Sequence, residues 1–341
     1  MSKLALKQNG VFEYFKESFV KNNSTECVLV KPISVGICSS DIPRAFSNKA
    51  YFYPLVLGHE FSVVVEHDPT NKFKKGTKCA VFPLLPCFKC DSCKSKKYNM
   101  CKDYSYYGSR VDGGLQTDLY INHWNLLEIP DKLDTFSTSL IEPISVCIHA
   151  SHKIIKDSSV LIYGGGFLSQ ILSQLLLQNN CQITVLDRNL YKKKFFNSSI
   201  KFLIENNNLE PSSFDFTIEC CGAEGILNEC IKFTKPGGTI LQMANPNSET
   251  HLNSAGISQL MRKEQSIIGT WNSDYRPDDR DLCDWNEAID MLVQKKIDIK
   301  SLISHQTTLE NATQLLNEIN ERRSKESKLK NYNKAIIQVN N

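Results

Sequence analysis

Three residues within the first sixty positions could together bind one metal ion. They are Cys38, His59 and Glu60, and glycines lie close before them at Gly36 and Gly58. Zinc accepts thiolate, imidazole and carboxylate ligands in mixed sets, and a catalytic zinc site keeps one position open for water or substrate. The sequence therefore predicts a metal centre that could hold a reacting molecule.

A second group of metal-binding type consists of cysteines alone, at Cys87, Cys90, Cys93 and Cys101. Four thiolates can fill a tetrahedral zinc shell completely, which is typical of a structural site. An iron–sulfur cluster is the main chemical alternative, because it also uses four thiolates. The chain has 13 cysteines, and this odd number argues against a disulfide framework. Thiolates at metal spacing fit a reducing cytoplasm, where we expect the protein to reside.

A glycine-rich turn marks a third candidate site. An apolar strand at 160–163 leads into it, a helical repeat follows, and a second strand at 181–186 ends at Asp187. This order is the dinucleotide-binding fingerprint in its required context. Glycines allow the tight turn and let a pyrophosphate approach the helix N-terminus closely. The residues expected to contact the coenzyme there are Gly164, Gly166, Phe167 and Leu168.

The acidic residue after the second strand bears on the choice of coenzyme. Asp187 is placed to accept hydrogen bonds from the adenosine ribose hydroxyls, and its charge would repel the extra phosphate of NADP. Arg188 follows directly and could pair with that phosphate. Because the aspartate comes first, we expect NAD, with NADP less favoured.

The pattern along the chain predicts an α/β protein of three parts. Residues 1–145 contain mostly strand-like runs and irregular loops. Residues 146–285 alternate strands with helices, which favours a doubly wound parallel sheet. In residues 286–341, the pattern predicts helices and a final strand at 334–339 that returns to the first domain.

Composition and charge exclude other classes of protein. The 341 residues carry a net charge of +3 without a basic block, so we expect no nucleic-acid partner. A zinc-binding nucleic-acid module built on the cysteines is also disfavoured, since no recognition helix follows them. The apolar runs fall short of the ~20 residues that a membrane span needs, so we expect no membrane partner.

Over essentially its whole length, the chain resembles the medium-chain zinc-dependent alcohol and polyol dehydrogenases. Cys38, Gly58-His59-Glu60, the four cysteines and the late glycine turn match that family in order and separation. The resemblance implies a GroES-like β-rich catalytic domain completed by the C-terminus, a Rossmann coenzyme domain, and a homodimer or homotetramer. Four further segments carry the likeness: SDIPRAF (40–46), YPLVLGHEFS (53–62), PLLPCF (83–88) and GSRVDGG (108–114).

The resemblance also implies roles for particular residues. Cys38, His59 and Glu142 would hold a catalytic zinc, with Glu60 either a fourth ligand or just outside the shell. The four-cysteine segment, 87–101, would hold a second, structural zinc. Each chain would then bind two zinc ions.

Several polar residues would support such a site. Ser40 would carry the substrate proton outward, as the resemblance implies. Asp41 is placed to accept a hydrogen bond from His59 and so fix its tautomer. Arg44 and Arg110 are candidates to bind a substrate phosphate, because a guanidinium can grip phosphate bidentately.

The expected activity is hydride transfer between NAD and a secondary alcohol of a polyol or polyol phosphate, which becomes a ketose. The family usually has glycine where Val63 stands and a longer connection than the one from Glu66 to Gly76, and the coenzyme domain here is compressed after Asp187. These departures keep open a second activity, NADPH-dependent reduction of a ketose phosphate such as ribulose 5-phosphate for surface-polymer synthesis. An alternative of another class is a catalytically inactive, zinc-stabilised binding protein.

Overall fold

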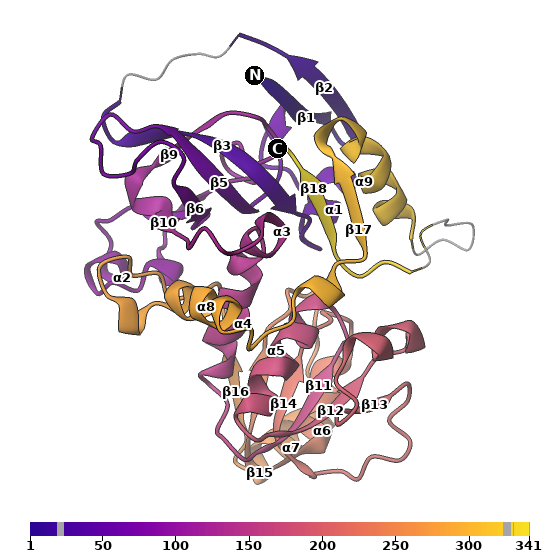
Figure 1. Ribbon diagram of the computed structural model, residues 1–341. Helices are drawn as coiled ribbons and strands as arrows, with labels where there is room; N and C mark the ends of the chain where they lie inside the picture. Colours follow the sequence, from indigo (N-terminus) through magenta and orange to yellow (C-terminus); the bar gives the residue numbers. More distant parts are fainter. Residues whose placement is uncertain (19–23, 323–328, 330, 341) are drawn as a thin grey trace. The chain divides into compact units, whose positions relative to one another are not determined.

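The computed structural model describes residues 1–18, 24–322, 329 and 331–340. The chain divides into two compact units (Figure 1). Unit 1 comprises Met1–Ser145 and Asp274–Asn341, and unit 2 comprises Val146–Ser273. The return to unit 1 therefore begins at Asp274, before the boundary at 285 that the sequence predicts.

Aromatic packing explains the earlier boundary. The ring of Tyr275 stacks on Phe82 with centroids 4.3 Å apart, and Trp285 meets Phe82 edge-on at 5.5 Å. The Tyr275 hydroxyl donates to the carbonyl of Trp124 at 2.9 Å. Phe82, Tyr275 and Trp285 are almost fully buried, so residues 274–285 belong to the interior of unit 1.

Unit 1 is built on a sheet that has seven strands in the described part of the chain. Its central strand β3 pairs antiparallel with β5 and, on the other side, with the C-terminal strand β18. Alternating apolar residues of β3, such as Val28 and Val30, are fully buried in the core. In sheet order the strands are β10 (Leu126–Glu128), β6 (Lys78–Val81), β5 (Glu60–His67), β3 (Cys27–Gly36), β18 (Ala335–Gln338) and β17 (His305–Thr308), with β9 (Leu119–Asn122) paired to β3.

Smaller elements of unit 1 surround this sheet. Helix α9 places Leu315, Leu316 and Ile319 in the same hydrophobic core, the spacing expected for one buried helix face. The other strands are β1 (Ser2–Gln8), β2 (Val11–Lys16), β4 (Leu55–Val56), β7 (Leu84–Leu85) and β8 (Ser105–Tyr106). The helices are α1 (Asp41–Phe46), α2 (Asp91–Lys94), α3 (Thr135–Thr138), α8 (Asp284–Val293) and α9 (Ala312–Glu321), with 3-10 turns η1 (Tyr98–Met100), η2 (His123–Asn125), η4 (Arg280–Leu282), η5 (Lys300–Leu302) and η6 (Leu309–Asn311).

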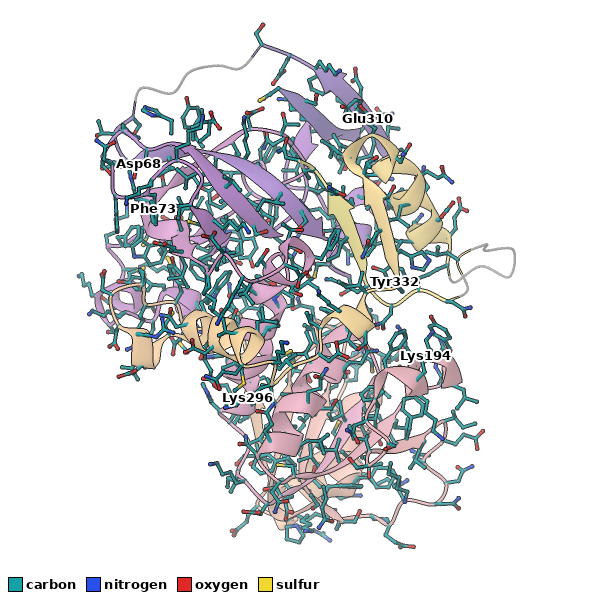
Figure 2. All side chains as sticks on the ribbon, viewed as in Figure 1. Asp68, Phe73, Lys194, Lys296, Glu310 and Tyr332 are labelled. Carbon is teal, nitrogen blue, oxygen red and sulfur yellow. The ribbon has the colours of Figure 1, made fainter. Side chains whose placement is uncertain are left out.

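A buried carboxylate fixes the loop that follows β5. Asp68 accepts hydrogen bonds from the backbone N–H groups of Phe73 and Thr70, both at 2.8 Å, and lies 2.6 Å from His123 Nε2. Figure 2 shows Asp68 and Phe73 close together in unit 1. Burial would raise the pKa of Asp68, but these hydrogen bonds lower it to about 2.

Unit 2 contains a parallel sheet whose order is β13-β12-β11-β14-β15-β16. The first strand in sequence, β11, is central, and the chain winds outward from it in both directions, which confirms the predicted doubly wound α/β fold. The strands are β11 (Ser159–Tyr163), β12 (Gln182–Leu186), β13 (Lys201–Leu203), β14 (Phe214–Glu219), β15 (Thr234–Gln242) and β16 (Ser266–Gly269). The helices are α5 (Phe167–Gln178), α6 (Ile226–Phe233) and α7 (Ser254–Arg262), and α4 (Ile141–Ser151) runs across the division between the units.

The compression predicted after Asp187 appears in the connections of this sheet. Between β12 and β13, the described residues form the 3-10 segment η3 (Leu190–Phe195) in place of an α-helix. Across all described residues, no helix has the length and apolar character required to cross a membrane.

Candidate active site and metal centres

Two paired strands bring the first predicted metal ligands together. Cys38 lies in the turn between β3 and α1, while His59 immediately precedes β5 and Glu60 begins it. Gly36 at the end of β3 is the pairing partner of Glu60. Ligand atoms of Cys38, His59 and Glu60 all lie within 4.8 Å of one another. Since zinc bonds are ~2.0–2.3 Å long, one ion could contact all three.

Gly36 provides the space that Glu60 occupies. A Cβ atom at position 36 would lie 2.3 Å from Glu60 Oε2 and 2.9 Å from Leu140 Cδ2. Gly58, just before His59, has a φ of +98°, which favours glycine. The glycines noticed in the sequence are therefore required by close packing and by backbone conformation.

Asp41 connects the thiol, the imidazole and an arginine. Its Oδ2 accepts the backbone N–H of Cys38 at 3.0 Å, and its Oδ1 accepts Arg44 Nη1 at 3.0 Å. His59 Nδ1 lies 3.3 Å from the same Oδ1. Asp41 has no solvent exposure. An imidazole held through Nδ1 can offer Nε2 to a metal.

The charges of this group depend on one another. Burial alone would raise the pKa of Asp41, but His59 and Arg44 hold it below its ordinary value. Burial would lower the pKa of His59, but Asp41 and Cys38 raise it well above its ordinary value. The site therefore favours an ionised Asp41 beside the imidazole.

Glu60 has a second partner from the C-terminal region. Its Oε2 forms an ion pair with Lys334 Nζ. Both side chains are buried, at 2% and 3% exposure. Lys334 immediately precedes β18, so the strand pairing within unit 1 carries this cation to the site.

Glu142 borders the three close residues and is not one of them. It lies in the first turn of α4, is 8% exposed, and accepts a hydrogen bond from the Tyr106 hydroxyl at 3.3 Å. The Tyr106 ring is 5.8 Å from that of His59. Burial and the charge of Glu60 raise the pKa of Glu142 to about 7, although His59 opposes the shift.

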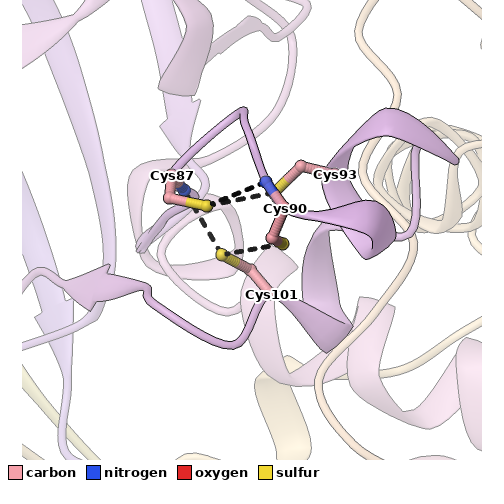
Figure 3. Close-up of side chains that lie close together, drawn as sticks. All are labelled: Cys87, Cys90, Cys93 and Cys101. Atoms are coloured by element: carbon pink, nitrogen blue, oxygen red, sulfur yellow. Dashed lines mark hydrogen bonds between the residues drawn. The ribbon is translucent and has the colours of Figure 1, made fainter.

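The four cysteines of the lobe 87–101 converge on one point (Figure 3). The Cys87–Cys93 and Cys90–Cys101 sulfur distances are 4.0 and 3.9 Å. A tetrahedron of sulfurs ~2.3 Å from zinc has edges of ~3.8 Å, so the residues present fit a zinc ion. Backbone N–H groups lower the pKa of Cys90 to about 6, whereas burial raises that of Cys93 to about 12.

The glycine turn of unit 2 has the predicted form. Gly164 has a φ of +96°, and a Cβ there would lie 2.9 Å from Cys221 Cβ. Gly166 is the N-cap of α5, and a Cβ there would meet no atom within 4 Å. The helix therefore begins at Phe167, and the space beside the Gly166 Cα is open.

Asp187 is already held in place after β12. Its Oδ2 accepts the Gly165 N–H and its Oδ1 accepts the Asn189 N–H, both at 2.7 Å. Ser169, in place of the third glycine, donates to the carbonyl of Gly164 at 2.5 Å. Arg188 is exposed.

The remaining predicted residues are in unit 1. Ser40 is the partly exposed N-cap of α1 and makes no side-chain capping bond. Arg44 donates a hydrogen bond to Asp41. The Arg110 guanidinium lies over the rings of Tyr104 and Tyr51, at 4.2 and 4.9 Å, and its Nη1 donates to the Tyr104 carbonyl at 2.6 Å.

Sequence reasoning missed Lys334 and Tyr106 as neighbours of the site. Neither lies in a metal-binding pattern: Lys334 reaches the site through the pairing of β18 with β3, and Tyr106 through its contacts with His59 and Glu142. The only available signal for Lys334 was its position at the start of the predicted C-terminal strand.

The comparisons with known proteins define the class. Residues 24–131 match the alcohol dehydrogenase GroES-like domain. The crystal structure of galactitol-1-phosphate dehydrogenase from Escherichia coli superposes with a TM-score of 0.87 at 25% identity, covering 99% of this chain and all of that one. Residues 24–131 are thus similar to the GroES-like domain of alcohol dehydrogenases, and nearly the whole chain is similar to zinc-dependent medium-chain dehydrogenases of the alcohol and polyol class, whose fold binds NAD(P).

Individual relatives have names that specify sugar alcohols or sugar acids. Galactitol 1-phosphate 5-dehydrogenase of Escherichia coli K12 is 29% identical over 308 residues, which cover 86% of this chain and 88% of the relative. Sorbitol dehydrogenase of Ovis aries is 28% identical over 308 residues, covering 84% of each. A zinc-binding dehydrogenase of Sinorhizobium meliloti bound to NADP shares the fold, with a TM-score of 0.85 at 19% identity.

Proposed function

We propose that the protein oxidises a secondary hydroxyl group of an open-chain polyol or polyol phosphate to the ketose, with NAD as hydride acceptor. The observation that carries the proposal is the convergence of Cys38, His59 and Glu60 within 4.8 Å, with Glu142 beside them. The names of the relatives support a polyol substrate. A catalytically inactive binding protein would need only the cysteine lobe at 87–101 for its stability, and not this second group of metal-binding residues.

The donor set fits a catalytic zinc. Cys38, His59 and Glu142 would hold the ion, and Glu60 would be a fourth ligand or lie just outside. When bound, zinc supplies the Lewis acidity that eases loss of the hydroxyl proton near neutral pH. The lobe at 87–101 would hold the structural zinc.

Residues around the proposed metal site would orient the histidine ligand and carry the substrate's hydroxyl proton away. Asp41 holds the His59 ring through Nδ1, and Arg44 holds Asp41 in turn. Ser40 follows Cys38 closely and its hydroxyl makes no capping bond. We assign to Ser40 Oγ the first step of proton transfer away from the substrate.

Asp187 supports NAD as the coenzyme. Two backbone N–H groups hold its carboxylate after β12, where an adenosine ribose would bind, and the charge would repel a 2′-phosphate. The exposed Arg188 and the NADP-bound structural neighbour favour the second candidate, NADPH-dependent reduction of a ketose phosphate. Gly164, Gly166, Phe167 and Leu168 would border the pyrophosphate in either case.

Arg110 is the better of the two phosphate candidates. Ring stacking holds its guanidinium plane in place, and a planar guanidinium suits bidentate phosphate binding. Arg44 uses Nη1 for Asp41, which supports a positioning role for it.

We further propose a cytoplasmic homodimer or homotetramer. In the described residues, β16 is one of the two edge strands of the unit 2 sheet, and Ile267 in it and Trp271 and Met261, close to it in sequence, are 37%, 48% and 72% exposed. Light scattering on the purified protein measures the subunit number, and a monomer at micromolar concentration would contradict this assembly.

A turnover screen tests the proposed activity. Free and phosphorylated tetritols, pentitols and hexitols are each assayed with NAD and NADP, before and after removal of zinc. We expect one phosphorylated polyol and NAD to give the highest kcat/KM, with Arg110→Gln raising KM for the phosphate ester only. Faster turnover of the free polyols would refute phosphate recognition, and absence of turnover with every alcohol would refute the activity.

A further inference from the structure

We propose that Ser169 is a positioning residue of the coenzyme site, and that it strengthens the preference for NAD(H) over NADP(H) by fixing the Asp187 carboxylate. The inference rests on the proposed function, since it concerns the same coenzyme site. It assigns a role to the residue that stands where the dinucleotide-binding pattern has its third glycine.

A buried hydrogen bond joins Ser169 to the glycine turn. The Ser169 hydroxyl donates to the carbonyl of Gly164 at 2.5 Å, and the residue is 1% exposed. A glycine at position 169 would allow close packing of helix and strand, but it would leave that carbonyl without this donor. Ser169 therefore ties the first turn of α5 to the glycine turn before it.

The same peptide group reaches Asp187 on its other side. Because a trans peptide bond is planar, the Gly164 carbonyl and the Gly165 N–H point in opposite directions within one plane. The Gly165 N–H donates to Asp187 Oδ2 at 2.7 Å. Ser169 and Asp187 thus hold one peptide plane from its two ends, and the hydroxyl fixes the direction in which the N–H meets the carboxylate.

Close packing transmits this orientation to the carboxylate. A Cβ atom at Gly165 would lie 3.2 Å from Asp187 Cβ and 3.4 Å from Asp187 Oδ2, so the side chain of Asp187 lies directly against the turn. Its other oxygen, Oδ1, accepts the Asn189 N–H at 2.7 Å. An ionised carboxylate has about four acceptor sites. Two backbone donors therefore fix the group and leave capacity for ribose hydroxyls.

The placement of Asp187 bears on the two coenzymes differently. A carboxylate at this position accepts hydrogen bonds from the adenosine ribose of NAD, and these bonds depend on its direction. NADP carries a phosphate in place of the 2′-hydroxyl, so it has no such bond to lose and is repelled by the charge. A peptide plane released from Ser169 would let the carboxylate turn, which should narrow the preference rather than weaken both coenzymes equally.

The test measures binding of NADH and NADPH to the purified full-length protein by nucleotide fluorescence, without substrate. We compare wild type with Ser169→Ala, with Ser169→Gly and with the control Ser173→Ala. Ser173 is a second buried serine of α5, 1% exposed, whose hydroxyl donates to the Gln170 carbonyl at 3.0 Å. We expect both Ser169 variants to narrow the ratio of the NADPH and NADH dissociation constants by about 2- to 10-fold, the range that one hydrogen bond between uncharged groups contributes. Ser173→Ala should keep the wild-type ratio.

A double-mutant cycle with Asp187→Ser tests whether the effect passes through the carboxylate. In the Asp187→Ser protein, adding Ser169→Ala should change the ratio by less than about 2-fold, because the two changes act on one interaction. A full further narrowing there, an unchanged ratio in Ser169→Ala, or tighter NADH binding in Ser169→Gly would overturn the inference. If wild type binds neither coenzyme, or binds NADPH more tightly, the proposed function itself fails, and this result is distinct because it precedes any substitution.

Discussion

Asp41→Asn changes the charge beside the metal ligands with little change in shape. The carboxylate accepts hydrogen bonds from the Cys38 N–H on one oxygen and from Arg44 on the other, and this second oxygen also lies 3.3 Å from His59 Nδ1. An amide has only one oxygen. Whichever way it turns, its NH2 group faces a donor in a site with no solvent exposure.

The size of the effect follows from these contacts. Hydrogen bonds to a charged group contribute about 1.5–3 kcal/mol each. Loss of one or two of them should lower the free energy of unfolding by roughly 2–4 kcal/mol, allowing for partial relaxation. Loss of the carboxylate that orients a ligating histidine typically weakens metal binding about 10–100-fold.

Two measurements check the expectation. Urea unfolding gives the stability, and competition with a chelator gives the zinc affinity of the catalytic site. Asp131→Asn, at an exposed position, is the matched control and should behave as wild type. Wild-type stability together with wild-type zinc affinity in Asp41→Asn would refute the role given to this carboxylate.

Two further changes test other parts of the structure. Asp187→Ser should narrow the preference for NAD over NADP in kcat/KM, because it removes repulsion of the 2′-phosphate; a wild-type preference for NADP would contradict this. Asp68, with its pKa lowered from 3.8 to about 2, stabilises the fold by about 2 kcal/mol above pH 4, and this contribution is lost as the pH falls toward 2. Urea unfolding should show that Asp68→Asn is less stable than wild type at pH 7. Its free energy of unfolding should also change less between pH 4 and pH 2 than that of wild type, and an equal change in both proteins would contradict the role given to Asp68.

Local patterns were enough to predict that the four cysteines converge and that a glycine turn joins β11 to α5. The four cysteines lie within one short segment, so their spacing nearly determines their convergence. The turn at Gly164 depends on consecutive elements, β11, α5 and β12, whose order can be read directly. The parallel sheet of unit 2 follows from the same alternation.

Long-range pairing accounts for what the sequence did not reveal. Lys334 meets Glu60 because β18 pairs with β3, and no local pattern near either residue indicates an ion pair. The stacking of Tyr275 on Phe82 likewise joins distant segments, and the chain returns to unit 1 at Asp274, earlier than the predicted 285. The contact of Arg44 with Asp41, by contrast, is local, between residues three apart in α1, and it occupies one nitrogen of a predicted phosphate ligand.

The zinc content of Cys38→Ala, measured together with its turnover, tests the central claim most directly. We expect two zinc ions per chain in wild type, and one in the variant, with no turnover and a retained fold by circular dichroism, because structural zinc in the lobe at 87–101 supports folding separately. Cys27→Ala is the control, because the thiol of Cys27 contacts Asn122 Oδ1 at 3.2 Å. This variant should keep two zinc ions and full turnover. Substantial turnover in Cys38→Ala, or two zinc ions in it, would contradict the catalytic metal site.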